Sequence, residues 1–135
     1  MNLEQVKEFI NQVHWGMLAT SDGRKVGVRP MGGLAWKQNQ LWCATAVSSD
    51  KVAQLKRVPH AEYCFADASG KHVRIAGPCT ISTDNAEKLW LYKAVPTLKD
   101  YFPDPAARDY VVIKMIPDNI RFTNPDFTYT RVELQ

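Results

Sequence analysis

Several features that identify common classes of protein are missing from this sequence. Its three cysteines, Cys43, Cys64 and Cys79, form neither a C-x-x-C pair nor a cysteine–histidine ligand pattern, so no zinc site or disulfide framework is indicated. No window approaches the roughly 20 consecutive apolar residues of a membrane-spanning helix. The first residues lack the apolar run of a secretory signal peptide. We therefore expect a cytoplasmic protein whose thiols are reduced and buried or half-buried.

Charge of one sign is not concentrated anywhere in the chain. The formal net charge of +3 arises from 17 Lys and Arg residues against 14 Asp and Glu residues, and their scatter disfavours a nucleic-acid-binding protein. No G-x-G-x-x-G follows a predicted strand, and G-x-S-x-G is absent, which disfavours a Rossmann fold and an α/β-hydrolase. A small positive excess still allows a local pocket for one phosphorylated small molecule.

What is present is the composition of an ordinary globular domain. The 135 residues, 45% apolar and 23% charged, suit one domain over 1–135 with a real core. Apolar periodicity predicts helices over 2–13, about 49–58 and from 83 onwards, with a short one at Pro96. Strands are predicted over 15–20, 25–36, 41–45, 61–67, 71–82, 110–116 and 120–123, and the tail 127–134 is a candidate for another. Many short strands with hairpin turns favour a closed or partly closed antiparallel barrel.

The predicted strand over 25–36 has an unusual centre. Alternation places four apolar residues on one face, which we expect to point into the core: Val26, Val28, Leu34 and Trp36. Arg29 and Met31 fall on the opposite face. Pro30 cannot donate to a strand ladder, which predicts an edge strand or a bulge here. The Gly32-Gly33 pair marks a place where another group can approach the backbone closely.

The segment after the third predicted strand is the most informative part of the chain. Thr45 ends that strand, and a helix begins a few residues later, where unpaired N–H groups and the helix dipole favour an anion. Ser48, Ser49 and Lys51 add hydroxyls and an ammonium group, which are donors suited to a phosphate. Helix capping by a serine is the competing interpretation. Asp50 would repel a phosphate, so we expect its side chain to point away.

Two further elements carry polar side chains that have two interpretations. Arg29 is either a solvated strand arginine or a second cation for the same phosphate. His72 and Arg74 share one face of the strand over 71–82, and they form either a solvated face or the edge of a ligand site.

In their order and spacing these motifs resemble the pyridoxamine 5'-phosphate oxidase-like split-barrel flavoproteins. The resemblance covers about residues 5–123 and rests on V-R-P-M, T-x-x-x-S-x-K and H-V-R-I-x-G. The later L-W…L-K-D-Y-F-P…Y-V-V-I-K run is similar to the small general-stress-protein branch. The resemblance implies a mainly β fold, a six-stranded antiparallel split β-barrel with flanking α-helices. It also implies a homodimer with two flavin mononucleotide (FMN) sites at the subunit interface.

The resemblance also implies roles for individual residues. The FMN phosphate would be held by Arg29, Thr45, Ser49 and Lys51. Pro30 and Met31 would line the isoalloxazine ring through their backbone, and His72 and Arg74 would come from the other subunit. The C-terminal tryptophan and arginine substrate signature of true pyridoxamine phosphate oxidases has no match here, so the vitamin B6 reaction is not expected.

The function expected from these features is that of an FMN-dependent oxidoreductase acting on a small molecule. Hydride would pass between a donor and the flavin, while the protein supplies binding and orientation. No side chain can be named as a catalytic acid or base. Two alternatives therefore stay open: a non-catalytic flavin-binding or electron-transfer module, and a split barrel that binds haem or a deazaflavin instead.

Overall fold

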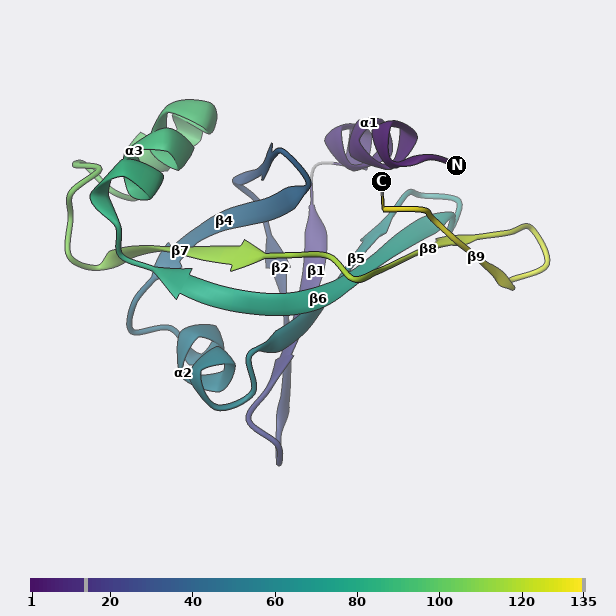
Figure 1. The fold of residues 1–135 in the computed structure, drawn as a ribbon, viewed down its shortest axis with the longest axis horizontal. Helices are drawn as coiled ribbons and strands as arrows, with labels where there is room; N and C mark the ends of the chain where they lie inside the picture. The colour runs from purple at the N-terminus through teal and green to yellow at the C-terminus, as the bar shows by residue number, and fades with distance from the viewer. Residues whose placement is uncertain (14, 135) are drawn as a thin grey trace.

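The computed structural model describes residues 1–13 and 15–134, and Figure 1 shows their arrangement. The α-helices of this part are α1 (Leu3–Val13), α2 (Asp50–Arg57) and α3 (Asn85–Ala94), and a 3-10 helix, η1 (Pro96–Asp100), follows α3. The strands are β1 (Gly16–Ser21), β2 (Val26–Met31), β3 (Leu34–Lys37), β4 (Gln40–Ala46), β5 (His60–Ala66), β6 (His72–Ser82), β7 (Tyr110–Met115), β8 (Asn119–Thr123) and β9 (Tyr129–Arg131). None of the helices described is long and apolar enough to cross a membrane.

The strands form one curled antiparallel sheet in the order β2-β1-β5-β6-β7-β4-β3, with β8 pairing with β6 and β9 pairing with β8. The long strand β6 causes the split of the barrel. Its first part, from Val73 to Ala76, pairs with β8, and its last part, from Cys79 to Ser82, pairs with β7. The predicted mainly β split barrel with flanking helices is therefore confirmed. The described residues form nine strands rather than six, partly because the predicted strand over 25–36 divides in two.

That division corrects one sequence-based expectation. Val26 and Val28 do not face the core, since their exposed fractions are 72% and 60%. The backbone turns at Gly33, whose φ is +66°, so the alternation of β2 does not continue into β3. Strand β2 lies at one end of the sheet path, as Pro30 predicted. Its inner face is occupied by Gly27, Arg29 and Met31 instead.

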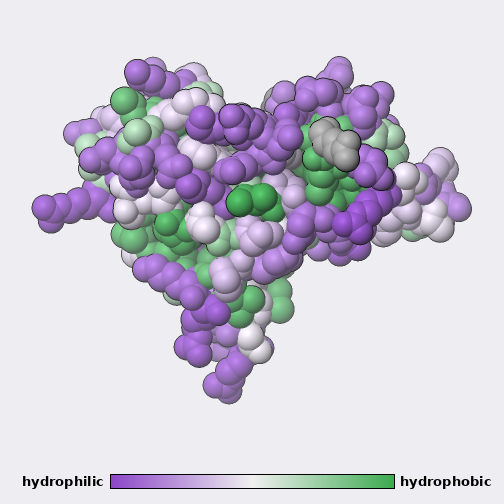
Figure 2. Space-filling view, in the orientation of Figure 1, coloured by the Kyte–Doolittle hydropathy of each residue, from purple (hydrophilic) through white to green (hydrophobic). Residues whose placement is uncertain are grey.

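Two apolar clusters hold the fold together. The larger one joins α1 to the inner face of the barrel and includes Val6, Leu18, Phe65 and Ile120. The smaller one lies under α3 and η1, where Leu91 and other side chains pack on β4 and β7. In the space-filling view a notch separates the side that carries α3 from the side that carries α1 (Figure 2). The packing of η1 matters for function, because this helix forms one wall of the candidate site.

Side-chain caps were predicted at the starts of α1 and α2, and the structure has the first of them. Asn2 and Gln5 form the expected capping box, with Asn2 N donating to Gln5 Oε1 over 2.8 Å and Gln5 N donating to Asn2 Oδ1 over 2.9 Å. This reciprocal pair satisfies two N–H groups at the start of α1. The start of α2 has no such side-chain cap.

Candidate functional site

A cavity of about 790 Å³ lies where the bend between β2 and β3 faces the end of β4, the start of α2 and the helix η1. Five of the nine residues predicted to bind the cofactor line it together: Pro30, Met31, Thr45, Ser49 and Lys51. These residues come from strands and a helix that are far apart in the chain. The fold therefore gathers one part of the predicted set into a single concave site.

The hydroxyl groups at this site are not used to cap the helix. Ser49 occupies the N-cap position of α2, with φ −70° and ψ 153°, but its side chain makes no capping hydrogen bond. Its Oγ lies 3.3 Å from Thr45 Oγ1 instead. The first N–H groups of a helix have no acceptor within that helix. The capping interpretation of Ser49 is thus not supported, and its hydroxyl is available to a ligand.

Lys51 is a half-buried cation without a partner in the part of the chain that the structure describes. Its ammonium group makes no ion pair within 4 Å and no hydrogen bond to any of residues 1–13 or 15–134. Burial lowers the pKa of Lys51, and the neighbouring charge of Arg29 lowers it further, while Cys43 and Asp50 act in the opposite direction. The charged form is therefore disfavoured by its surroundings, and a bound anion would stabilise it. This donor set fits a phosphate end group.

Three neighbouring residues have different positions. Arg29 does not line the cavity. Its guanidinium donates to Thr20 Oγ1 over 2.7 Å and to the carbonyl oxygens of Leu18 and Gly27 over 3.3 and 3.2 Å. Ser48 is exposed and is not a lining residue either. Asp50 is exposed and lies outside the lining, in agreement with the expectation that it points away.

The glycine pair between β2 and β3 is closely covered by two side chains that also line the cavity. A Cβ atom at Gly32 would lie 2.9 Å from Cζ3 of Trp15, and one at Gly33 would lie 3.3 Å from Cδ2 of Leu98. A larger residue at either position would have to displace the neighbouring side chain. At Gly33 it would also have to adopt a strained positive φ. The absence of side chains at Gly32 and Gly33 thus allows Trp15 and Leu98 to pack directly against the backbone beside the cavity.

Sequence reasoning missed the aromatic and acidic part of this site. The cavity is also lined by Trp15, Thr97, Asp100, Tyr101 and Phe102. Trp15 was expected to be a core or interface residue, and 59% of it is exposed in the single chain. The sequence points to the L-K-D-Y-F-P run only through the family resemblance. A carboxylate followed by two aromatic residues at the end of the short helix that begins at Pro96 was the signal that could have drawn attention to it.

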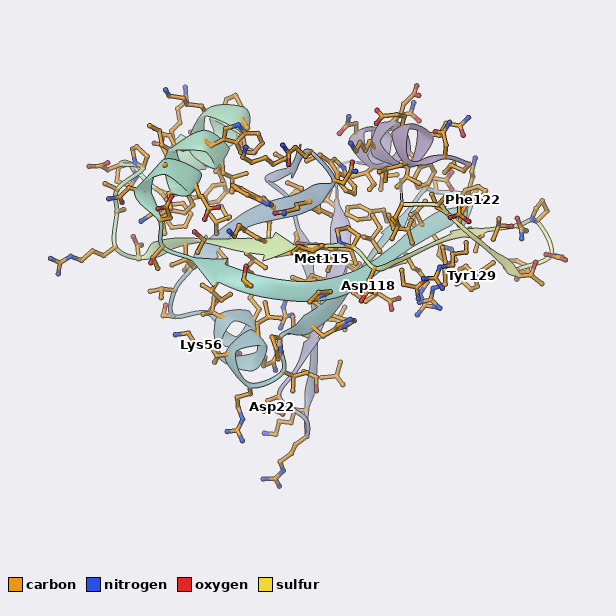
Figure 3. All side chains as sticks on the ribbon, in the orientation of Figure 1. Asp22, Lys56, Met115, Asp118, Phe122 and Tyr129 are labelled. Carbon is orange, nitrogen blue, oxygen red and sulfur yellow. The ribbon has the colours of Figure 1, made fainter. Side chains whose placement is uncertain are left out.

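His72 and Arg74 lie apart from the cavity, beside the β8–β9 hairpin. His72 Nε2 is 2.7 Å from the hydroxyl oxygen of Tyr129, and Glu62 accepts hydrogen bonds from Arg74 and Arg121. Both guanidinium groups also lie over the ring of Tyr129, where nitrogen atoms gather around the labelled side chain in Figure 3. Glu62 raises the pKa of Arg74. Within the described residues of one chain, His72 and Arg74 do not line the cavity.

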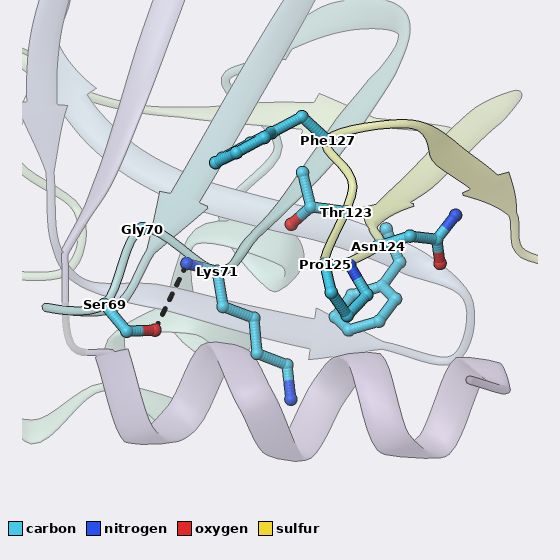
Figure 4. A pocket seen from close by; sticks show the side chains of 8 residues that line it. Ser69, Gly70, Lys71, Thr123, Asn124, Pro125 and Phe127 are labelled. Atoms are coloured by element: carbon cyan, nitrogen blue, oxygen red, sulfur yellow. Dashed lines mark hydrogen bonds between the residues drawn. The ribbon is translucent and has the colours of Figure 1, made fainter.

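A second hollow of about 460 Å³ lies between α1 and the turns that join β5 to β6 and β8 to β9 (Figure 4). Its one charged lining residue is Lys71, whose ammonium lies over the rings of Phe9 and Phe122 at 5.7 and 5.1 Å. Thr123 exchanges two hydrogen bonds with the backbone of His72. The polar groups here are thus engaged with the protein itself.

The cysteines do not offer a nucleophile. Cys43 and Cys79 are buried and Cys64 is half-buried, and all three are free thiols as expected. Burial raises the pKa of Cys43 to about 11 and that of Cys79 to about 12. The reactive thiolate form is therefore scarce at neutral pH. Within the described part of the chain, no group of three or more His, Cys, Asp or Glu side chains could hold a metal ion.

Comparison with known proteins places the chain in a recognised group. Residues 1–122 match the sequence model of the family described as "Pyridoxamine 5'-phosphate oxidase like". A NimC/NimA family protein from Clostridium acetobutylicum superposes with a TM-score of 0.84 at 18% identity, covering 96% of this chain and 90% of that chain. General Stress Protein 26 from Bacillus anthracis gives 0.77 at 22%, covering 95% and 96%.

A third solved structure shares the fold. It is a protein from Clostridium acetobutylicum related to general stress protein 26 of B. subtilis, of the pyridoxinephosphate oxidase family. It superposes with a TM-score of 0.81 at 17% identity and covers 96% of this chain and 92% of that chain. No curated protein sequence matches this chain significantly. At these identities the structural neighbours establish the fold alone.

Proposed function

We propose that this chain, which belongs to the pyridoxamine 5'-phosphate oxidase-like family, is an FMN-binding oxidoreductase that acts on a small molecule. The family is flavin-binding in general. The choice of FMN, the redox role and the cytoplasmic location are parts of the proposal. The observation that carries it is that Lys51, whose ammonium group has no partner among residues 1–13 and 15–134, lines one cavity together with Thr45 and Ser49, whose hydroxyl oxygens lie 3.3 Å apart.

These groups suit a terminal phosphate because each of them can donate a hydrogen bond from the lining of the cavity. An ammonium group and two hydroxyls add to the N–H groups of the first helical turn, and charge-assisted hydrogen bonds of this kind are about twice as strong as neutral ones. Arg29 would add to the positive potential without touching the ligand, because its guanidinium is held by Thr20. A terminal phosphate is present in FMN and absent from riboflavin, so the site should distinguish the two.

The remainder of the cavity suits a flat ring system. Pro30, Met31, Gly32 and Gly33 line one side of the cavity, and a planar ligand would lie along this side next to the Trp15 ring, which rests against Gly32. Bound FMN would supply a hydride-accepting and hydride-donating ring. The chain's own residues would hold the phosphate, orient the ring and exclude water from one of its faces.

The proposal includes a homodimer, which is supported by one uncovered face of the sheet. Met17 is paired with Pro30 and Cys64, and Cys64 is paired with Arg74. Paired residues of an antiparallel sheet point to the same side, as do residues two positions apart. Val26, Val28, His72 and Arg74 therefore share this outer face, which is apolar at β1–β2 and polar at β6. A second copy would cover the apolar part and bring His72 and Arg74 to an interface.

The proposal is tested first by the absorption spectrum of freshly purified protein and by titration of flavin-free protein. FMN should bind and riboflavin should bind much more weakly, because riboflavin lacks the phosphate. A Soret band would indicate haem instead of a flavin. Tight binding of a deazaflavin but not of FMN would show that the cofactor is a deazaflavin. Equal affinity for FMN and riboflavin would contradict the proposed phosphate site.

The redox role needs a separate experiment. Rapid mixing of the FMN-loaded protein with NADH or NADPH should bleach the flavin absorbance near its long-wavelength maximum. Reduction no faster than that of FMN alone in buffer would favour a non-catalytic flavin-binding module.

A further inference from the structure

We infer that the hollow between α1 and the β8–β9 hairpin (Figure 4) is a separate binding site, which takes a small aromatic carboxylate. The ligand class meant here is a flat apolar ring system that carries one carboxylate and no other polar group. The inference is independent of the proposed function, because none of the residues that line this hollow lines the cavity that would hold FMN.

The hollow lies on the face of the sheet opposite to the proposed dimer contact. Phe122, which lines it, is paired with Val73 of β6. Val73 is buried in the core cluster that includes α1, and it alternates along β6 with His72 and Arg74. Successive side chains of a strand point to opposite faces, so Phe122 lies on the side that α1 covers. A second copy over the outer face would therefore leave the hollow open to a ligand.

The only charge among the lining residues is that of Lys71. Lys71 is exposed, and its ammonium, 5.7 and 5.1 Å from the ring centres of Phe9 and Phe122, makes no ion pair within 4 Å in residues 1–13 and 15–134. The carboxylate of Asp67 is occupied, because hydrogen bonds from Ser69 and from the backbone of Lys71 lower its pKa, as does the Lys71 charge. The ammonium is thus left to attract an anion that enters the hollow.

The other polar side chains of the lining are already paired within the protein. Thr123 Oγ1 exchanges two hydrogen bonds with the backbone of His72. The amide of Asn124 is bonded at both ends to threonine hydroxyls of the hairpin, over 3.1 Å each. A ligand can therefore gain one charge contact and apolar contacts, but few hydrogen bonds. This combination disfavours a sugar or a nucleotide and favours an apolar acid.

Phe127 lines the same hollow in an unfavourable arrangement. It is 80% exposed, and its φ of +65° lies in the left-handed region that bulky residues avoid. In Figure 4 the side chain of Lys71 runs toward α1, whereas Phe127 lies on the side of the hollow away from α1. Backbone strain of this kind is found at ligand clamps. A flat ring in the hollow would bury part of the Phe127 ring, which is why the proposed ligand is aromatic.

The test uses two probes that share a naphthalene ring and differ in charge, 2-naphthoate and its neutral counterpart 2-naphthamide. Calorimetric titration of the protein in the presence of excess FMN should show about three- to five-fold preference for 2-naphthoate. Lys71→Met should abolish this preference, because methionine keeps a flexible apolar side chain over the rings but removes the charge. Lys93→Met, at an exposed lysine of α3, is the matched control and should keep the preference.

A second variant and a second measurement locate the probe. Phe127→Asn should weaken both probes by about two- to five-fold, while the fold should persist because asparagine tolerates a positive φ. In two-dimensional NMR spectra, 2-naphthoate should shift the amide signals of Gly70 and Phe127 but not those of Thr45 and Lys51.

Three results would overturn the inference. The first is equal affinity for the two probes or no detectable binding of 2-naphthoate, and the second is a preference that survives in Lys71→Met. The third is a shift of the Thr45 and Lys51 signals in place of those of Gly70 and Phe127, which would show that the probe occupies the other cavity.

Discussion

At the scale of single residues, Lys51 is the side chain on which the anion site depends most. Lys51→Ala should weaken FMN binding by about 1–3 kcal/mol, because it removes a charge-assisted hydrogen bond from a half-buried site. Fluorescence titration of flavin-free protein measures this. Lys56→Ala is the matched control, since Lys56 lies on the same helix but is exposed (Figure 3). An equal loss in both variants would show that net charge, rather than contact, holds the ligand.

At the scale of elements, α2 and α3 begin in physically different ways. Asp84 caps α3 by accepting a hydrogen bond from the N–H group of Glu87 over 3.0 Å, whereas Ser49 leaves α2 without a side-chain cap. Asp84→Ala should therefore lower the free energy of unfolding by about 1 kcal/mol. Ser49→Ala should change it by less than about 0.5 kcal/mol, while still weakening FMN binding. Urea unfolding of both variants gives the comparison, and a large stability loss in Ser49→Ala would restore the capping interpretation.

A comparison of the predicted and observed elements shows what local sequence patterns can and cannot predict. The helices and most strands lie where periodicity and turn residues predicted them, since those signals act within a few residues. The alternation over 25–36 predicted one strand with an inward apolar face, which was wrong for Val26 and Val28. Alternation of residues along a strand identifies its two faces, but it does not say which face meets the core. This matters here because the strand lies at a sheet edge and the chain bends at Gly33.

At the scale of the whole molecule, the outer face of β1 and β2 is the proposed contact with a second copy. Val28→Glu places a charge in the middle of this apolar surface and should shift the protein from dimer to monomer, because burying an unpaired carboxylate is costly. Sedimentation velocity measures the mass. Leu89→Glu is the control, since Leu89 is exposed on α3, and it should remain dimeric. A wild-type protein that sediments as a monomer would contradict the proposed assembly.

The monomer produced by Val28→Glu should also bind FMN less tightly. In the proposed dimer His72 and Arg74 reach the ligand from the other subunit, so a monomer would keep only the phosphate contacts. Unchanged FMN affinity in a monomeric Val28→Glu variant would show that the site is complete within one chain.

The sequence by itself determined the features that depend on near neighbours in the chain. These include the Asn2–Gln5 capping box, the edge position of the strand with Pro30, and the succession of hydroxyls and Lys51 at a strand-to-helix junction. The family resemblance could be stated for the same reason, because it rests on short motifs in a fixed order.

Only the tertiary structure decided which of these residues meet. It separated His72 and Arg74 from the cavity, turned Arg29 toward Thr20, and brought Trp15 and the 97–102 segment beside Thr45 and Lys51. The curl of the sheet joins segments more than 50 residues apart, and local propensity carries no information on such pairings. Long-range packing of the whole sheet, rather than any one motif, thus sets the shape and charge of the site.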